Sequence, residues 1–351
     1  MQTILGIIYH SLGGFASGSF YMPYNRVRKW RWESYWIVGG IFSWLIVPPI
    51  AAWLTVPDFM QIIREAASSV FWITFLLGLL WGIGGLTYGL GVRYLGMSLG
   101  NSVTLGFCAA FGSIVPPVYY CFYPTPGKIS FIDMIASPGG RVVLTGVLIC
   151  LVGIAVCGRA GVLKEHEISE EQSRKSVAEF NLVKGLIIAI ISGILSSFMN
   201  FGIEAGKPLA DVAVAHGANP LFQNNVAYVV ILWGGLATNL IWCALLSVKN
   251  RSYSDFTDTS SPIARNVLFC ALAGTTWFLQ FFFYGMGESK LGNGASSWIL
   301  HMSTIILTAN MWGIVQHEWT GTSRGTKRTI IVGILLIIAA VSLVGLGNSI
   351  S

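Results

Sequence analysis

Charged side chains are scarce in this sequence: they make up 10% of its 351 residues, whereas 54% are hydrophobic. An average soluble domain has about 25% charged residues. So few charges cannot give a soluble protein of this length a polar surface. The composition excludes a soluble enzyme, a nucleic-acid-binding module and a disordered chain, and it predicts an all-helical protein that crosses a lipid bilayer several times.

Sequence motifs for catalysis and metal binding are also missing. The chain has no GxSxG, HExxH, Walker or dinucleotide-binding motif, so we predict no enzyme activity, no catalytic residue and no ATP-driven transport within it. The six cysteines lie in apolar runs without CxxC or His/Cys spacing, which indicates buried thiols and no metal or other cofactor. The glycine-rich stretch Gly82-x-Gly84-Gly85 indicates close helix packing, because no strand precedes it as in a phosphate-binding loop.

Ten apolar runs are long enough to cross a bilayer as helices, which takes about 20 residues. The first run lacks the basic segment that opens a signal peptide, so we expect it to be retained. The predicted spans are 4–24, 34–55, 69–92, 97–122, 141–160, 184–205, 222–247, 263–287, 291–316 and 328–348.

A charged segment divides these spans into two groups of five. It carries five charges of each sign, counted with its flanks, and we interpret it as a solvated linker. The predicted organisation is a first five-helix repeat at 1–160, a charged cytoplasmic linker at 161–183, and a second five-helix repeat at 184–351.

Basic residues are distributed unevenly between the two sides that ten spans define. Sixteen lie in or beside the connections on the side of the linker, and five lie on the other side. Because Lys and Arg are enriched in cytoplasmic loops, we expect the linker in the cytoplasm and both termini in the periplasm.

The two halves share a pattern at a constant offset of 196 residues. Trp81-x6-Tyr88-Gly89-x-Gly91-x3-Leu95-Gly96 recurs as Trp277-x6-Tyr284-Gly285-x-Gly287-x3-Leu291-Gly292. Since each half has five predicted spans, the second copy enters the membrane from the opposite side. Inverted repeats of this kind are typical of alternating-access transporters.

Polar and aromatic residues share faces of the predicted helices. Trp277, Gln280 and Tyr284 lie on one face, and Trp81 and Tyr88 share another. Both tryptophans fall deep in their spans, away from the interfacial aromatic belt. The face either packs in the core or lines a cavity for a sugar, whose C–H face stacks on aromatic rings while its hydroxyls bond to amides.

Other polar groups extend this candidate site. Span six presents Ser197, Asn200 and Glu204 on one face, and Glu204 either pairs with nearby Lys207 or exchanges a proton. Trp298 and His301 on span nine and His10 on span one lie well inside their spans, where each histidine either exchanges protons or bonds as a neutral ring. We interpret the carboxylates that flank spans as solvated helix ends: Glu33, Glu288 and Glu318.

Several stretches carry a family resemblance. They include Trp81-Gly82-Ile83-Gly84, Arg93-Tyr94-Leu95-Gly96-Met97-Ser98, Gln280-Phe281-Phe282-Phe283-Tyr284 and Ser297-Trp298-x-Leu300-His301-Met302-Ser303. The chain resembles the L-rhamnose/proton symporter family of the drug/metabolite transporter superfamily almost end to end, although it departs from the family pattern at Asn101-Ser102 and at residues 287–294. The resemblance implies a ten-helix, inverted-repeat importer of the bacterial inner membrane that takes up L-rhamnose with protons.

The sequence therefore predicts a secondary transporter that imports a small sugar, L-rhamnose or a related deoxysugar, with protons. Its partners are the sugar, protons and the lipid bilayer, with no nucleic acid. Two alternatives remain open: a metabolite or drug exporter of the same superfamily, and a membrane sugar sensor that does not translocate. The candidate substrate-binding residues are Trp81, Tyr88, Asn200, Trp277, Gln280, Tyr284, Trp298 and His301, and those for proton coupling are Glu204, His10 and His301.

Overall fold

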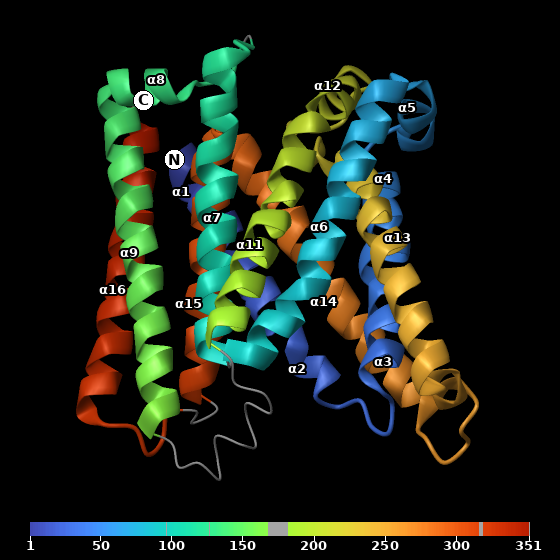
Figure 1. Cartoon of the computed structure of the whole chain (residues 1–351). Helices are drawn as coiled ribbons and strands as arrows, with labels where there is room; N and C mark the ends of the chain where they lie inside the picture. The colour runs from blue at the N-terminus through green and yellow to red at the C-terminus, as the bar shows by residue number, and fades with distance from the viewer. Residues whose placement is uncertain (96, 126, 168–181, 316–318, 351) are drawn as a thin grey trace.

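The protein is a bundle of long helices that run side by side (Figure 1). The computed structural model describes residues 1–95, 97–125, 127–167, 182–315 and 319–350, and these ranges contain helices and no strand. Both termini lie at the same end of the bundle, near α8, and α2 lies at the other end (Figure 1). The helices are α1 (Gln2–Ser19), α2 (Tyr21–Tyr24), α3 (Trp32–Gly40), η1 (Ile41–Ile46), α4 (Val47–Thr55), α5 (Phe59–Glu65), α6 (Ser68–Leu95), α7 (Met97–Phe122), α8 (Phe131–Ala136), α9 (Pro138–Glu167), α11 (Leu182–Ala205), α12 (Lys207–Ala215), η2 (Pro220–Phe222), α13 (Asn225–Asn250), η3 (Ser252–Phe256), α14 (Ile263–Leu291), α15 (Gly294–Val315) and α16 (Arg324–Ser349).

Eight helical segments within the described residues are long and apolar enough to cross a membrane, judged by length and composition. This confirms an all-helical, multi-pass membrane protein but not the count of ten spans. Helices α1 and α15, which correspond to the first and ninth predicted spans, are not among the eight. The eight segments are Trp32–Thr55, Ser68–Gly91, Val103–Phe122, Pro138–Lys164, Val183–Ala215, Pro220–Asn250, Ile263–Leu291 and Arg324–Ser349.

The second predicted span is a helix with a wide turn in its middle. Residues Ile41–Ile46 form the π-helical turn η1 between α3 and α4. Pro48 and Pro49 follow after Val47, and because proline has no N–H the α-helical bonds to the carbonyls of Trp44 and Leu45 cannot form. The chain therefore adopts a wider turn before the prolines, in a pattern that often marks functional positions.

The predicted linker at 161–183 begins later than expected, because α9 continues as helix to Glu167. The Glu167 carboxylate accepts hydrogen bonds from the Thr326 hydroxyl and from the backbone N–H and hydroxyl of Ser323, which tie it to the start of α16. These bonds hold the pKa of Glu167 below its usual value. Residues 168–181 of the linker lie outside the described residues.

The main hydrophobic core extends from Trp44 through Phe278 and Trp298 to the contact between α9 and α16. A second core lies beneath α5 and α12 and includes Ile62 and Leu209. Five of the six cysteines are buried, as predicted, whereas Cys121 is half-buried.

Glycines bring helices of the bundle into backbone contact at two equivalent places. Gly78 of α6 packs against the carbonyl of Ile231 on α13, and Gly274 of α14 packs against the carbonyl of Gly39 on α3; in each case a Cβ on the glycine would overlap the carbonyl oxygen. The two glycines differ by the same 196 residues as the repeated motif. Helix α1 packs on α14 and α15, while α11 packs on α6 and α7.

We predict that Gly78→Ala or Gly274→Ala destabilises the folded protein by about 1–3 kcal/mol, because the added methyl group forces two backbones apart. Gly85→Ala on α6 is the matched control, since a Cβ there meets nothing within 4 Å. Thermal unfolding of purified protein in detergent measures the difference. Equal melting temperatures for the three variants would contradict this packing.

A second prediction concerns orientation. A reporter that is active only outside the cytoplasm should be active when fused after Ser351 and silent when inserted at Arg174, because the excess of basic residues lies on the side of Arg174. The reverse pattern would contradict the predicted topology.

Candidate functional site

One face of α14 carries the groups from which the candidate site is built. Trp277, Phe281, Tyr284 and Glu288 follow one another at three- or four-residue spacing, so they form a column along the helix. Phe281, Tyr284 and Glu288 are buried and Trp277 is half-buried. The column runs from an aromatic cluster, past two histidines, to a group of charged side chains.

The two histidines flank Tyr284 in the middle of this column. The ring of Tyr284 lies 5.2 Å from that of His10 on α1 and 5.3 Å from that of His301 on α15, and the two imidazoles are 6.0 Å apart. Both histidines are fully buried, and none of their ring nitrogens has a hydrogen-bond partner among the described residues. Because unpaired buried polar groups are costly, this arrangement favours a water molecule or a polar ligand at this place.

Two glycines leave the space that the imidazoles occupy. A Cβ on Gly287 of α14 would lie 2.7 Å from His10 Nε2, and a Cβ on Gly13 of α1 would lie 3.2 Å from His301 Cε1. Larger residues at these two positions would push the imidazole rings away from Tyr284. Gly287 belongs to the repeated motif, and its close packing against His10 explains why a glycine stands at this position.

Hydrogen bonds connect Tyr284 to the neighbouring helices. Its hydroxyl donates to Asn200 Oδ1 at 3.2 Å, and Asn200 Nδ2 donates to the Gly112 carbonyl of α7 at 2.8 Å. Trp298 is also buried, and its indole N–H donates to the Cys108 carbonyl at 3.0 Å. Since its N–H is already bonded to α7, Trp298 packs α15 against α7 in this conformation.

The aromatic cluster forms the other end of the column. Trp81 and Trp277 lie 5.6 Å apart, tilted by 34°, and Trp44 stands edge-on to both, at 6.2 and 6.0 Å. Because the repeat is inverted, the sequence predicts that the two motif tryptophans reach the middle of the membrane from opposite sides and stand on opposing walls of a cavity. The structure instead brings their rings together, so no sugar fits between them in this conformation.

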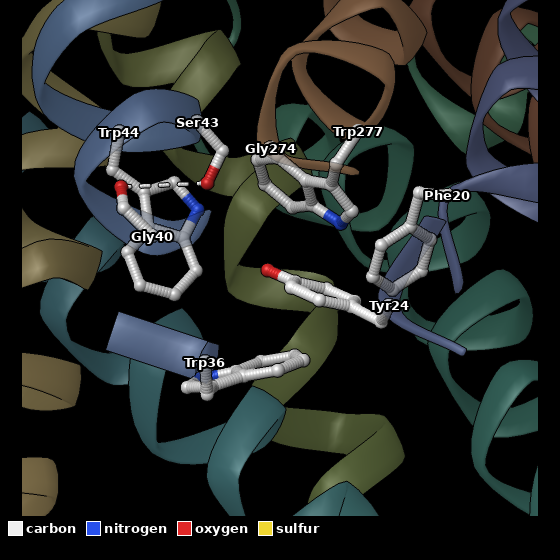
Figure 2. A pocket seen from close by; sticks show the side chains of 8 residues that line it. All are labelled: Phe20, Tyr24, Trp36, Gly40, Ser43, Trp44, Gly274 and Trp277. Carbon is white, nitrogen blue, oxygen red and sulfur yellow. Dashed lines mark hydrogen bonds between the residues drawn. The ribbon is translucent and has the colours of Figure 1, made fainter. Parts of the chain in front are cut away.

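A small pocket lies beside this cluster. It is lined by Phe20, Tyr24, Trp36, Gly40, Ser43, Trp44, Gly274 and Trp277. Figure 2 shows the indole nitrogens of Trp44 and Trp277 and the Tyr24 hydroxyl turned toward its middle. Trp44 is 4% exposed, and its indole N–H has no partner among the described residues. The pocket volume of about 10 Å³ holds about one water molecule in this conformation, so the pocket has to open before its flat rings and its N–H and O–H groups can bind a small hydroxylated molecule.

Sequence reasoning missed Ser43 and Trp44 as lining residues. The π-helical turn η1 places both on the pocket side of the α3–α4 segment. The Pro48-Pro49 pair beside a tryptophan in an apolar run was the available signal. Tyr24 and Trp36 were missed as well, although their region is dense in aromatic residues.

Gln280 and Tyr88 lie differently from the other predicted residues. The Gln280 side chain is buried and donates to the Trp277 carbonyl of its own helix at 3.0 Å. Tyr88 is half-buried on α6 and lies near Tyr21, which places it near the pocket end of the column.

Four charged side chains meet at the other end of the column, and their pairing corrects two predictions. Glu204 accepts from Lys128 Nζ at 2.6 Å and from the Tyr120 hydroxyl at 2.9 Å. Lys207 pairs with Glu288 at 2.8 Å, so of the two alternatives for Glu204 the direct ion pair with Lys207 is wrong. Glu288 is 5% exposed and also accepts from Asn224 Nδ2, so it is not a solvated helix end.

Glu33 was also expected to be a solvated helix end, and the structure contradicts this. It is 4% exposed at the start of α3 and accepts a hydrogen bond from Asn250 Nδ2 at 2.9 Å, because the end of α13 covers it. Glu318 lies outside the described residues. Within the part of the chain that the structure describes, no group of three His, Cys, Asp or Glu side chains is placed to hold a metal ion.

Comparison with known proteins identifies the family. A family model described as L-rhamnose-proton symport protein matches residues 1–350. Proteins named L-rhamnose-proton symporter from Yersinia pestis (strain Pestoides F) and Yersinia pseudotuberculosis (serotype O:1b, strain IP 31758) are each 39% identical over 349 residues, which is 98% of this chain and 98% of theirs. Since the match covers every element described above, the chain belongs to the L-rhamnose-proton symporter family.

Proposed function

We propose that this protein imports L-rhamnose or a related deoxysugar together with protons, by alternating access across the bacterial inner membrane. Membership of the family is the observation that carries the proposal. A buried column of aromatic, hydroxyl, amide and imidazole groups supports it, because such groups inside a membrane protein mark substrate and ion pathways. As a transporter, the protein would have no catalytic activity.

We further propose that the chain has ten spans arranged as two inverted repeats of five, with both termini in the periplasm. The packing of the helices supports this. Exchanging α1 with α11, α6 with α14 and α7 with α15 converts the contacts of α1 with α14 and α15 into the contacts of α11 with α6 and α7. The matching pair of glycine contacts and the meeting of Trp81 with Trp277 agree with a pseudo-twofold axis near the aromatic cluster.

In this proposal the sugar binds along the column on α14. Trp277, Trp81 and Trp44 supply ring faces, and hydroxyl and amide groups nearby supply hydrogen bonds. Asn200, Tyr284, Gln280, Tyr88 and His301 are the candidates for those bonds. Trp298 would act by packing, because its N–H is already bonded to Cys108.

Proton coupling would involve Glu204 and the two buried histidines. Glu204 lies at the charged end of the column, whereas His10 and His301 lie beside Tyr284. A proton taken up at the charged end would pass these groups before it reaches the aromatic cluster.

Coupling predicts a pH change on sugar entry. Adding L-rhamnose to de-energised cells that contain the protein should make the medium more alkaline, because sugar moving down its gradient carries protons inward. A pH electrode measures the change, and a protonophore should abolish sugar accumulation while leaving sugar exchange intact. A sodium requirement without any pH change would contradict proton coupling.

The aromatic pocket predicts a change in affinity. Trp277→Phe keeps a ring but loses the indole N–H, so L-rhamnose binding should weaken about fivefold, since one hydrogen bond contributes about 1 kcal/mol. Trp72→Phe is the matched control, because Trp72 is 55% exposed on the outside of α6. Fluorescence titration of purified protein gives the affinity, with melting temperatures measured alongside.

A double variant distinguishes a role in sugar binding from a role in packing. If the Trp81→Phe/Trp277→Phe double variant binds L-rhamnose with normal affinity, the two tryptophans serve packing alone.

A further inference from the structure

We propose that Glu288 binds the proton that is coupled to sugar entry, and that Lys207 responds by moving from Glu288 to Glu204. This inference rests on the proposed function and assigns a residue and a movement to its coupling step. It follows from the pairing of the four charges at the end of the column, which comprise two carboxylates and two ammonium groups: Lys128, Glu204, Lys207 and Glu288.

Glu288 is the more deeply placed of the two carboxylates. It is 5% exposed, against 13% for the Glu204 side chain. It lies one turn of α14 from Tyr284, whose ring contacts both histidines and whose hydroxyl bonds to Asn200. A change of charge at Glu288 therefore alters the electrostatic potential at Tyr284 and at the side chains that contact it.

Lys207 connects separate elements through Glu288. It begins α12, and its ammonium group reaches across to Glu288 on α14. It also donates to Asn224 Oδ1 at 3.4 Å, and Asn224 Nδ2 in turn donates to Glu288. The contact between α12 and α14 at this point thus depends on the negative charge of one carboxylate.

A second carboxylate is available to Lys207 close by. Glu204 precedes it by three residues, across Gly206. Both carboxylates face the same small space beside Gly294: a Cβ there would lie 2.5 Å from Glu204 Oε1 and 3.9 Å from Glu288 Oε1. The bonds from Lys128 and Tyr120 both go to Glu204 Oε2, so Oε1 faces the space that Lys207 would enter.

The step can be written with its charges balanced. A proton from the aqueous side forms an O–H bond on Glu288, the carboxylate becomes neutral, and the ion pair with Lys207 is lost. The four-charge group then carries one net positive charge, and Lys207 moves to Glu204, the remaining carboxylate, because an ammonium left unpaired in a buried site is costly. The other titratable groups near Glu288 are Tyr228 on α13, Tyr284 on α14 and Tyr120 on α7, and His10 on α1 packs against the neighbouring Gly287.

Glu288→Gln tests the proposal, because the amide imitates the protonated carboxyl. One charge moving through about 100 mV contributes about 2.3 kcal/mol, which corresponds to roughly 50-fold accumulation of sugar. In membrane vesicles with an imposed potential, Glu288→Gln should lower accumulation to the external concentration and leave L-rhamnose exchange intact. Asp211→Asn is the matched control: it removes an exposed carboxylate near Lys207 and should keep full accumulation.

The pH profile of exchange separates a proton site from a merely structural role. Exchange by the unaltered protein should slow as pH rises, because fewer protons are available to bind with the sugar, whereas exchange by Glu288→Gln should not depend on pH. If Glu288→Gln alone fails to fold, Glu288→Gln/Lys207→Gln removes both charges of the ion pair and should again exchange without accumulating.

Each outcome decides one point. If the unaltered protein does not accumulate L-rhamnose with protons, the proposed function fails. If it does, and the folded Glu288 variants also accumulate sugar or have lost exchange, the assignment of the proton to Glu288 is overturned.

Discussion

A polar group surrounded by hydrocarbon has to find its hydrogen-bond partners within the protein, and this constraint shapes the column on α14. The Tyr284 hydroxyl bonds to Asn200, Asn200 bonds to the backbone of α7, and the indole of Trp298 bonds to the same helix. These bonds bring α7, α11, α14 and α15 together around one centre. The imidazoles of His10 and His301 and the Trp44 indole are among the buried polar groups without a hydrogen-bond partner in the part of the chain that the structure describes.

Close approach of the helices is the second requirement. Apolar side chains give little net attraction between helices in lipid, so packing depends on small residues that let backbones touch. Gly78 and Gly274 do this at corresponding places in the two halves, while Gly13 and Gly287 make room for the two imidazoles. The polar centre and the small residues around it therefore depend on each other.

The sequence predicted those features that a helical period or a repeat encodes. The apolar runs located the long helices within a few residues, and the constant offset identified Trp81 and Trp277 as a related pair that the fold brings into contact. Sequence-based prediction failed where a side chain finds its partners on distant segments of the chain. Glu288 resembles a solvated helix end when read along the chain, and only the fold reveals Lys207 and Asn224 beside it. Nearness in sequence likewise favoured a Glu204–Lys207 pair, whereas Lys128, beyond α7, takes that place.

The shape of the pocket depends on the helix register at the wide turn Ile41–Ile46. An α-helix turns by about 100° for each residue, so removing the extra residue of a π-turn rotates one flanking segment against the other by that amount. Such a rotation would carry Trp44 and Ser43 away from Trp277 without breaking the α3–α4 segment. Because Pro48 and Pro49 cannot donate the α-helical bonds to the carbonyls of Trp44 and Leu45, they fix the register of this turn and with it the position of the pocket wall.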